Sequence, residues 1–305
     1  MHLLTSLLSF FTITGNYCHA QEIPANQLML PEGRHPIPFI WMSENDNVYA
    51  AMLIPVKLKG SPFTFYMQFD TGSPYSMFYR NKLLRIGERY PLAVQVTDTT
   101  GSLHKFSFNV GDMPVLANEI SVQQHDSIGI NWNRDAINII GTLGTDLIDN
   151  KLIEINYPEK QLLIGAGEEE KPEWDQLIYE KRRILFPSAI KGKISILFFD
   201  TGSSAYALLT NEATARSLSV PGAVPITQEV ESWGKQLKAI QLATADSIDI
   251  AGKKLAIRTV AYIEGISEAQ VNIMKRTGIS GMTGNRLFLD AVLVLDTKNK
   301  RFYVR

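Results

Sequence analysis

Short runs of hydrophobic residues, separated by Gly and Pro, recur along the chain from Val48 onward. Runs of about five apolar residues bounded by turn-forming residues are typical of β-strands. Helix-like stretches are rare, and we expect short helices at Asn81 to Arg89 and Asn211 to Leu218. The pattern therefore predicts an all-β protein.

The same four residues follow two of these runs. Asp70-Thr71-Gly72-Ser73 comes directly after Phe65 to Phe69, and Asp200-Thr201-Gly202-Ser203 comes directly after Ile194 to Phe199. Asp, Thr and Gly are common turn residues, so one copy alone could simply close a strand. Two copies after two similar strands indicate that the chain has two equivalent halves.

A longer repeat supports this division. Residues 140–148 and 152–164 align without a gap on residues 280–288 and 292–304. Each copy reads as a Gly-x-x-Gly turn, a short helix and a closing hairpin. An internal duplication of this length predicts two similar β-lobes that face one another.

With these motifs, the chain resembles the pepsin-like, two-lobed aspartic proteases over roughly residues 46 to 305. The resemblance implies the bilobal aspartic protease fold, with one chain supplying both halves, and hence a monomer. The expected organisation is a signal peptide (1–20), an extended lead-in (21–45), an N-terminal lobe (46–167), an interlobe linker (168–184) and a C-terminal lobe (185–305).

The resemblance assigns catalysis to Asp70 and Asp200. Two carboxyl groups about 3 Å apart cannot both ionise, so they share one proton. One can then activate a water molecule while the other protonates the carbonyl oxygen of a peptide bond. This chemistry requires no cofactor and no metal. The alternative is a peptide-binding or inhibitor-like protein that keeps the fold without catalysing.

Neighbouring residues take supporting roles under the same resemblance. Thr71 and Thr201 would each bond the opposite loop and so set the spacing of the aspartates. Gly72 and Gly202 would let backbone N–H groups approach the carboxylates, where they favour the charged form.

Two further pairs complete the implied site. Ser73 and Ser203 would hydrogen-bond the outer carboxylate oxygens. Gly141 and Gly281 match the apolar-apolar-Gly motif that packs behind each loop, although Ser280 is more polar than that motif expects.

A flap is expected from residues 94–110, which we interpret as a hairpin with Thr99, Thr100, Gly101 and Ser102 at its tip. Gly101 would supply the positive φ of a tight turn. The family usually presents a Tyr near this tip, and the hairpin has none. An ordinary surface hairpin is the alternative. Trp233, at the equivalent place in the second half, is expected to be a packing or rim residue.

Composition narrows the list of partners. The formal net charge of −1 and the pI near 6.5 argue against a nucleic-acid partner, which would require a basic face. The histidines show no metal-ligand spacing. We therefore expect a peptide or protein substrate.

The first twenty residues have the features of a secretory signal. Leu3 to Ile13 is apolar, and Cys18-His19-Ala20 ends in a small-x-small pattern. Such a signal predicts a secreted or periplasmic protein without disulfides, because Cys18 is the only cysteine. An uncleaved anchor, a buried helix and a lipid on Cys18 are the alternatives.

We predict that the exported protein begins near Gln21 and is indifferent to reductant. Mass spectrometry of the secreted or periplasmic product measures its first residue. Intact Met1 in a cytoplasmic fraction would contradict the prediction.

Overall fold

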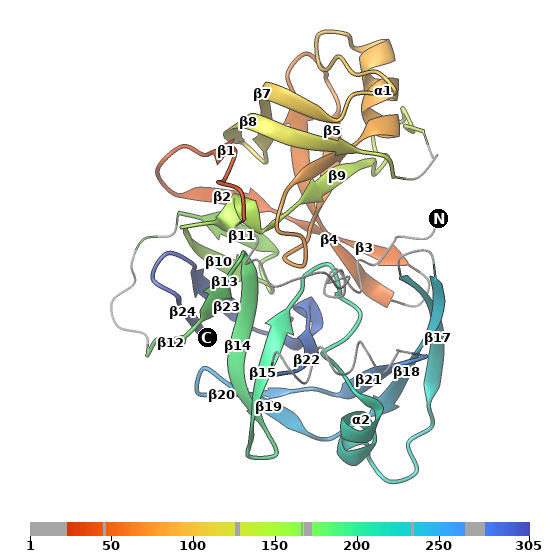
Figure 1. Ribbon diagram of the computed structural model, residues 1–305, viewed down its shortest axis with the longest axis vertical. Helices are drawn as coiled ribbons and strands as arrows, with labels where there is room; N and C mark the ends of the chain where they lie inside the picture. Colours follow the sequence, from red (N-terminus) through yellow and green to blue (C-terminus); the bar gives the residue numbers. More distant parts are fainter. Residues whose placement is uncertain are drawn as a thin grey trace, which may run out of the picture.

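A computed structural model describes residues 23–44, 47–125, 129–165, 167, 173–232, 235–265 and 278–305. Figure 1 shows two lobes, one above the other, with strands from both halves of the chain meeting between them. Each lobe is built on its own β-sheet, and a third sheet joins the two. The predicted all-β, bilobal fold is confirmed.

The sheet of the first lobe has the order β1-β8-β6-β9-β5-β4-β3, with β7 paired to β4 and β8. Its strands are β1 (Leu28–Met29), β3 (Ile40–Glu44), β4 (Asn47–Leu58), β5 (Thr64–Phe69), β6 (Met77–Tyr79), β7 (Ser102–Val110), β8 (Met113–Gln123) and β9 (Ile139–Leu143). β5 runs parallel to β9, with a register shift after Tyr66.

The sheet of the second lobe repeats this plan, because β15 runs parallel to β22 with a register shift after Ile196. Its strands are β13 (Ile178–Glu180), β14 (Arg183–Ile190), β15 (Lys193–Phe199), β16 (Leu208–Thr210), β17 (Ile226–Ser232), β18 (Lys235–Ala243), β19 (Ser247–Ile250), β20 (Lys253–Ala256), β21 (Thr259–Glu264) and β22 (Ile279–Thr283).

A six-stranded sheet joins the lobes in the order β12-β24-β23-β10-β11-β2. Its strands are β2 (His35–Pro38), β10 (Leu152–Asn156), β11 (Gln161–Ile164), β12 (Asp175–Gln176), β23 (Val292–Asp296) and β24 (Arg301–Val304). The closing hairpins of the two repeats lie edge to edge here, because β10 pairs antiparallel with β23. The repeat therefore supplies the joint between the lobes.

The expected lead-in and linker are not separate segments. Strands β1, β2 and β3 lie within the lead-in and pair with β8, β11 and β4. Strands β12 and β13 lie within the linker and pair with β24 and β14. β1, β2 and β12 thus gain order from partners that are distant in the sequence, whereas β3 and β13 form local hairpins.

Both predicted helices are present as α1 (Arg80–Arg89) and α2 (Glu212–Leu218). α1 buries Leu83 and Ile86, one helical turn apart on the same face. Asn211 caps α2, because its side chain accepts a hydrogen bond from Thr214 N at 2.9 Å. Among the described residues, no helix has the length and apolar character needed to cross a membrane.

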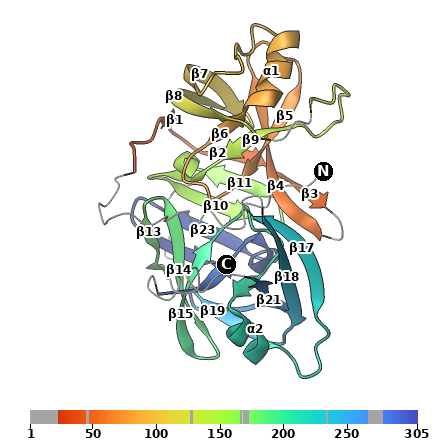
Figure 2. The ribbon, with the colours of Figure 1, turned by 45° about the vertical axis from the view of Figure 1, so that its right-hand side comes forward.

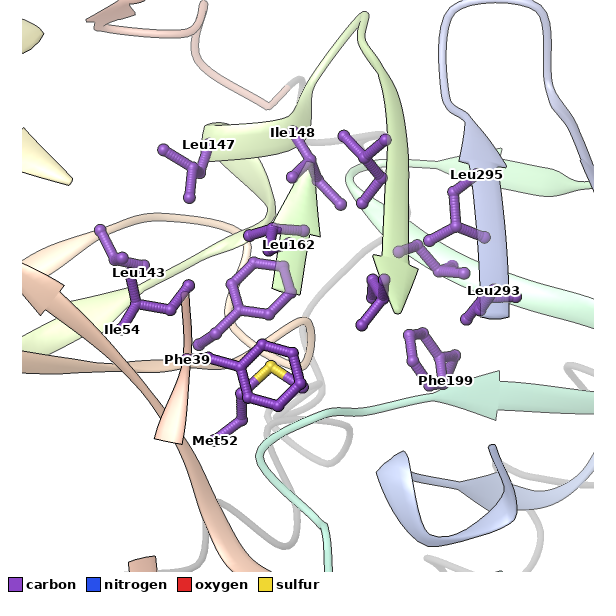
Figure 3. Close-up of a cluster of buried hydrophobic side chains, with 14 of the residues drawn as sticks. Phe39, Met52, Ile54, Leu143, Leu147, Ile148, Leu162, Phe199, Leu293 and Leu295 are labelled. Atoms are coloured by element: carbon purple, nitrogen blue, oxygen red, sulfur yellow. The ribbon is translucent and has the colours of Figure 1, made fainter. Parts of the chain in front are cut away.

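One large hydrophobic cluster runs through both lobes and the sheet between them. Figure 3 shows part of it, with Phe39, Met52 and Leu143 of the first half on one side and Phe199 and Leu293 of the second half on the other. All five are buried. Burying a large apolar side chain contributes about 1.5 to 3 kcal/mol to the free energy of unfolding. This shared core therefore holds the two lobes packed against each other.

The predicted hairpin at residues 94–110 is wrong. The hairpin is formed by β7 and β8, and its turn lies at Gly111 and Asp112. Gly111 has a φ of +59°, whereas Gly101 is not in the positive-φ region. The left-handed turn glycine of this segment is therefore Gly111.

We predict opposite outcomes for alanine at these two glycines. Gly111→Ala should destabilise the fold by about 1 to 2 kcal/mol, because a Cβ is disfavoured at positive φ and would lie 3.1 Å from Ile37 Cγ2. Gly101→Ala is the matched control, since a Cβ there meets no atom within 4 Å. Urea denaturation of both variants measures the difference, and equal stabilities would contradict this account.

Candidate functional site

Two aspartates from opposite lobes meet at the centre of the molecule. Asp70 follows β5 and Asp200 follows β15, each directly after an interior strand of the sheet of its lobe. Each backbone N–H donates to the end of a neighbouring strand, Asp70 N to Leu143 O and Asp200 N to Thr283 O, both at 2.9 Å. Both side chains are almost buried, with exposed fractions of 4% and 2%.

Reciprocal hydrogen bonds between Thr71 and Thr201 hold the two loops together. Thr71 N donates to Thr201 Oγ1 at 2.9 Å, and Thr201 N donates to Thr71 Oγ1 at 3.0 Å. The hydroxyls also cross to the opposite strand, where Thr71 Oγ1 donates to Phe199 O and Thr201 Oγ1 donates to Phe69 O. This is the arrangement that the resemblance implies for these residues.

Backbone donors fix the orientation of each carboxyl group. Gly72 N donates to Asp70 Oδ1, and Gly202 N donates to Asp200 Oδ1, both at 2.8 Å. A Cβ on Gly72 would lie 2.7 to 2.8 Å from three atoms of the Asp200 carboxyl group. Only glycine at position 72 therefore lets the first loop approach the aspartate of the second.

The two carboxyl groups perturb one another. Burial, then the charge of Asp70 and a hydrogen bond with it, hold the pKa of Asp200 well above its ordinary value. The N–H groups of Gly202 and Ser203 lower this pKa, but they do not outweigh burial. The pair therefore retains a proton at pH values where an exposed aspartate has lost its own.

The two serines differ from the expected arrangement. Ser73 Oγ donates to Tyr75 O at 2.7 Å rather than to a carboxylate. Ser203 Oγ is buried and has no hydrogen-bond partner among the described residues. The predicted bonds from these serines to the outer carboxylate oxygens are therefore absent from the described contacts.

The turns behind the loops supply contacts that the motif did not predict. Thr145 Oγ1 donates to Ser73 O, and Asn285 Nδ2 donates to Thr201 O at 2.9 Å. These residues occupy equivalent positions in the internal repeat, so the repeat itself was the available signal. Gly141 and Gly281 lie behind the same loops, where a Cβ would clash with Met77 O and Leu209 O.

A buried carboxylate, Asp146, braces the first loop from behind. It accepts hydrogen bonds from Ser76 N at 2.8 Å and Ser76 Oγ at 2.7 Å. Burial raises the pKa of Asp146, although these bonds from Ser76 lower it. Nothing in the sequence motif distinguished this aspartate from a surface residue.

The residues predicted to form the flap tip do not lie at the tip of a hairpin. Thr100 N donates to Thr97 O within a local turn, and Arg80 Nε of α1 donates to Thr100 O at 3.1 Å. Val122 N of β8 donates to Gly101 O at 2.8 Å. Thr99 bonds Thr97, and Ser102 pairs with Ser121 on β8. The segment is thus held against α1 and β8 and is not the tip of a hairpin.

Two other predictions concern metals and Trp233. Among the described residues, no group of three or more His, Cys, Asp or Glu could hold a metal ion. Trp233 and Gly234 lie outside the described residues, so the expected role of Trp233 stays a prediction.

Comparisons with known proteins identify the fold. No family model and no curated protein sequence matches the chain. Among solved structures, the chain is similar to an aspartic proteinase from Irpex lacteus, with a TM-score of 0.52 and 15% sequence identity. The match covers 89% of this chain and 97% of the other. At this identity the likeness establishes the fold, and it agrees with the two-lobed architecture described above.

We predict that Asp200→Asn changes how stability depends on pH. A raised pKa in the folded state means that the contribution of Asp200 to stability is fully present below its ordinary pKa of about 4, and is lost as pH rises through the folded value. Asn does not titrate, so the variant should lose less stability between pH 4 and pH 7 than the wild type.

Asp249→Asn is the matched control, because Asp249 is exposed on β19. Urea denaturation at several pH values gives the free energy of unfolding of all three proteins. Parallel curves for wild type and Asp200→Asn would show that Asp200 titrates normally.

Proposed function

We propose that this chain is an aspartic endopeptidase in which Asp70 and Asp200 act as one acid and base pair. The observation that carries the proposal is the contact between two buried carboxyl groups, whose loops are held together by reciprocal threonine bonds and of which Asp200 has a raised pKa. A buried pair of like charges is costly, and perturbed carboxyl pairs are concentrated at functional sites.

The geometry supports different roles for the two aspartates, with Asp200 as the acid and Asp70 as the base. Asp200 holds the shared proton, because burial and the charge of Asp70 raise its pKa. Asp70 then accepts a proton from a water molecule, whose oxygen forms a bond to the carbonyl carbon of the peptide. Asp200 gives its proton to the carbonyl oxygen. The intermediate collapses when the C–N bond breaks: the amine nitrogen takes the proton that Asp70 accepted from water, and a hydroxyl group of the tetrahedral carbon returns a proton to Asp200 as it becomes the new carbonyl.

We propose a peptide or protein substrate bound between the lobes. The β3–β4 hairpin of the first lobe and the β17–β18 hairpin of the second approach each other on one side of the molecule (Figures 1 and 2). Val48, near the start of β4, is hydrophobic and 55% exposed. We propose an extended peptide with apolar side chains, because such side chains would pack against Val48.

Export and a monomeric state belong to the same proposal. One chain supplies both aspartates, so a second copy is unnecessary for the pair. The apolar stretch from Leu3 to Ile13 supports a secreted or periplasmic location.

We predict that Asp70→Asn and Asp200→Asn each reduce kcat/KM for a peptide mixture by about 100-fold or more. The double variant should be little worse than either single variant, because residues that act as a unit are strongly non-additive. Wild-type activity should be greatest at acidic pH, between the two apparent pKa values of the pair.

Peptide affinity is measured for the same four proteins, since Asn keeps the shape of the site. A wild type that binds peptide but never cleaves it would favour the alternative, a peptide-binding protein. A single variant with nearly full activity, or a rate that rises steadily to pH 9, would show that this pair is not the catalytic one.

A further inference from the structure

A cavity of about 490 Å³ lies where the two lobes meet, apart from the aspartates. Its lining includes Trp41 of β3, Tyr49 of β4 and Tyr157 of the turn after β10. The ring of Trp41 stacks on Tyr157 with an interplanar angle of 10°, and it meets Tyr49 edge-on at 5.3 Å. These contacts give the cavity a preformed aromatic wall.

Basic side chains surround the same cavity. Lys160, Lys254 and Arg286 line it, and among the described residues none of their side chains has an ion pair or hydrogen bond. Arg258 and Asp290 also line it, and they form an ion pair with each other at 3.1 Å. The local charge is thus strongly positive in a chain whose net charge is −1. Clustered charges of one sign raise the local concentration of the opposite ion.

The internal repeat shows that Arg286 is not required by the fold at its position. It lies in η3 (Asn285–Leu287), and its equivalent in the first lobe is Asp146 in η2 (Thr145–Ile148). Asp146 is buried and bonds Ser76, whereas Arg286 is exposed at the cavity. The same position of the repeat therefore carries a buried, hydrogen-bonded carboxylate in the first lobe and an exposed arginine in the second.

We propose that this cavity binds an organic anion in which a carboxylate is attached to a flat apolar body. Trp41 and Tyr49 are half-buried and offer ring surface on which a flat ring packs, while the buried Tyr157 supports Trp41 from behind. Lys254 and Arg286 offer charge-assisted hydrogen bonds to the carboxylate. The volume lies within the range of small-molecule sites, roughly 300 to 1,000 Å³. A free aromatic acid and the C-terminal aromatic residue of a peptide share this chemistry.

The proposed site adjoins the aspartate loop without including it. Tyr157 donates from its hydroxyl to Asn285 Oδ1 at 2.8 Å, and Asn285 Nδ2 donates to Thr201 O at 2.9 Å. One side chain thus separates the cavity wall from the loop that carries Asp200. Binding is measurable without proteolysis, so failure of the proposed function would leave this proposal intact.

The test is calorimetric titration of the full protein with 2-naphthoate at low ionic strength, with the uncharged 2-naphthamide as the comparison ligand. The acid should bind at least about tenfold more tightly than the amide, since hydrogen bonds to charged groups are the strong ones. Arg286→Gln and Lys254→Gln should each weaken binding by about threefold to tenfold. Lys253→Gln, next to Lys254 on β20 but not lining the cavity, should leave it unchanged.

A second readout locates the ligand. Bound naphthoate should change the tryptophan fluorescence of the wild type, and Trp41→Phe should remove this change while retaining the aromatic wall. The dipeptide acetyl-Leu-Phe as the free acid identifies the source, because tighter binding than naphthoate assigns the site to peptide ends and weaker binding assigns it to small acids. Equal binding of acid and amide, or unchanged affinity in both Arg286→Gln and Lys254→Gln, would overturn the proposal.

Discussion

The crossed bonds between Thr71 and Thr201 are the constraint on which the centre of the molecule depends. Two carboxylate charges within about 3 to 4 Å of each other repel by roughly 4 to 6 kcal/mol at an effective dielectric constant of about 20. Four threonine bonds of about 0.5 to 1.5 kcal/mol each are of the same size. The bonds and the repulsion are therefore nearly balanced, and a shared proton removes most of the repulsion. The raised pKa of Asp200 is thus a condition of the fold as well as of the proposed chemistry.

The six-stranded sheet makes this contact possible because it joins the lobes directly behind the loops. Each of its two closing hairpins also contributes a side chain that hydrogen-bonds the turn of the other half. Tyr157, after β10, bonds Asn285 of the second lobe, while Thr297, after β23, bonds Ile148 O of the first. Tyr157 and Thr297 are equivalent in the repeat. Each half is therefore tied to the turn of the other, and a movement of one lobe must disturb both anchors together.

The repeated motifs predicted the fold and the aspartate pair because they are recognised from neighbouring residues alone. Each Asp-Thr-Gly-Ser directly follows its strand in the sequence. The flap prediction failed because 99–102 and 111–112 are both plausible turns, and long-range contacts decide between them. Arg80 of α1 holds Thr100, so the first turn never becomes a hairpin tip. The lead-in was equally hard to predict, because β2 gains its order from β11, more than one hundred residues away. Such pairings leave no short-range pattern.

Duplication also explains why the lobes differ most at positions that the fold constrains least. Thr145 and Asn285 both bond the aspartate loop of their own lobe, so both positions stay polar and buried. The next position carries Asp146 in one lobe and Arg286 in the other, because only the first lobe uses it to bind Ser76. Among the residues that the structure describes, no side chain pairs with Arg286, so its charge is open to solvent or to an anion. The positions at which the two lobes differ, such as Asp146 and Arg286, therefore indicate which side chains the shared fold does not require.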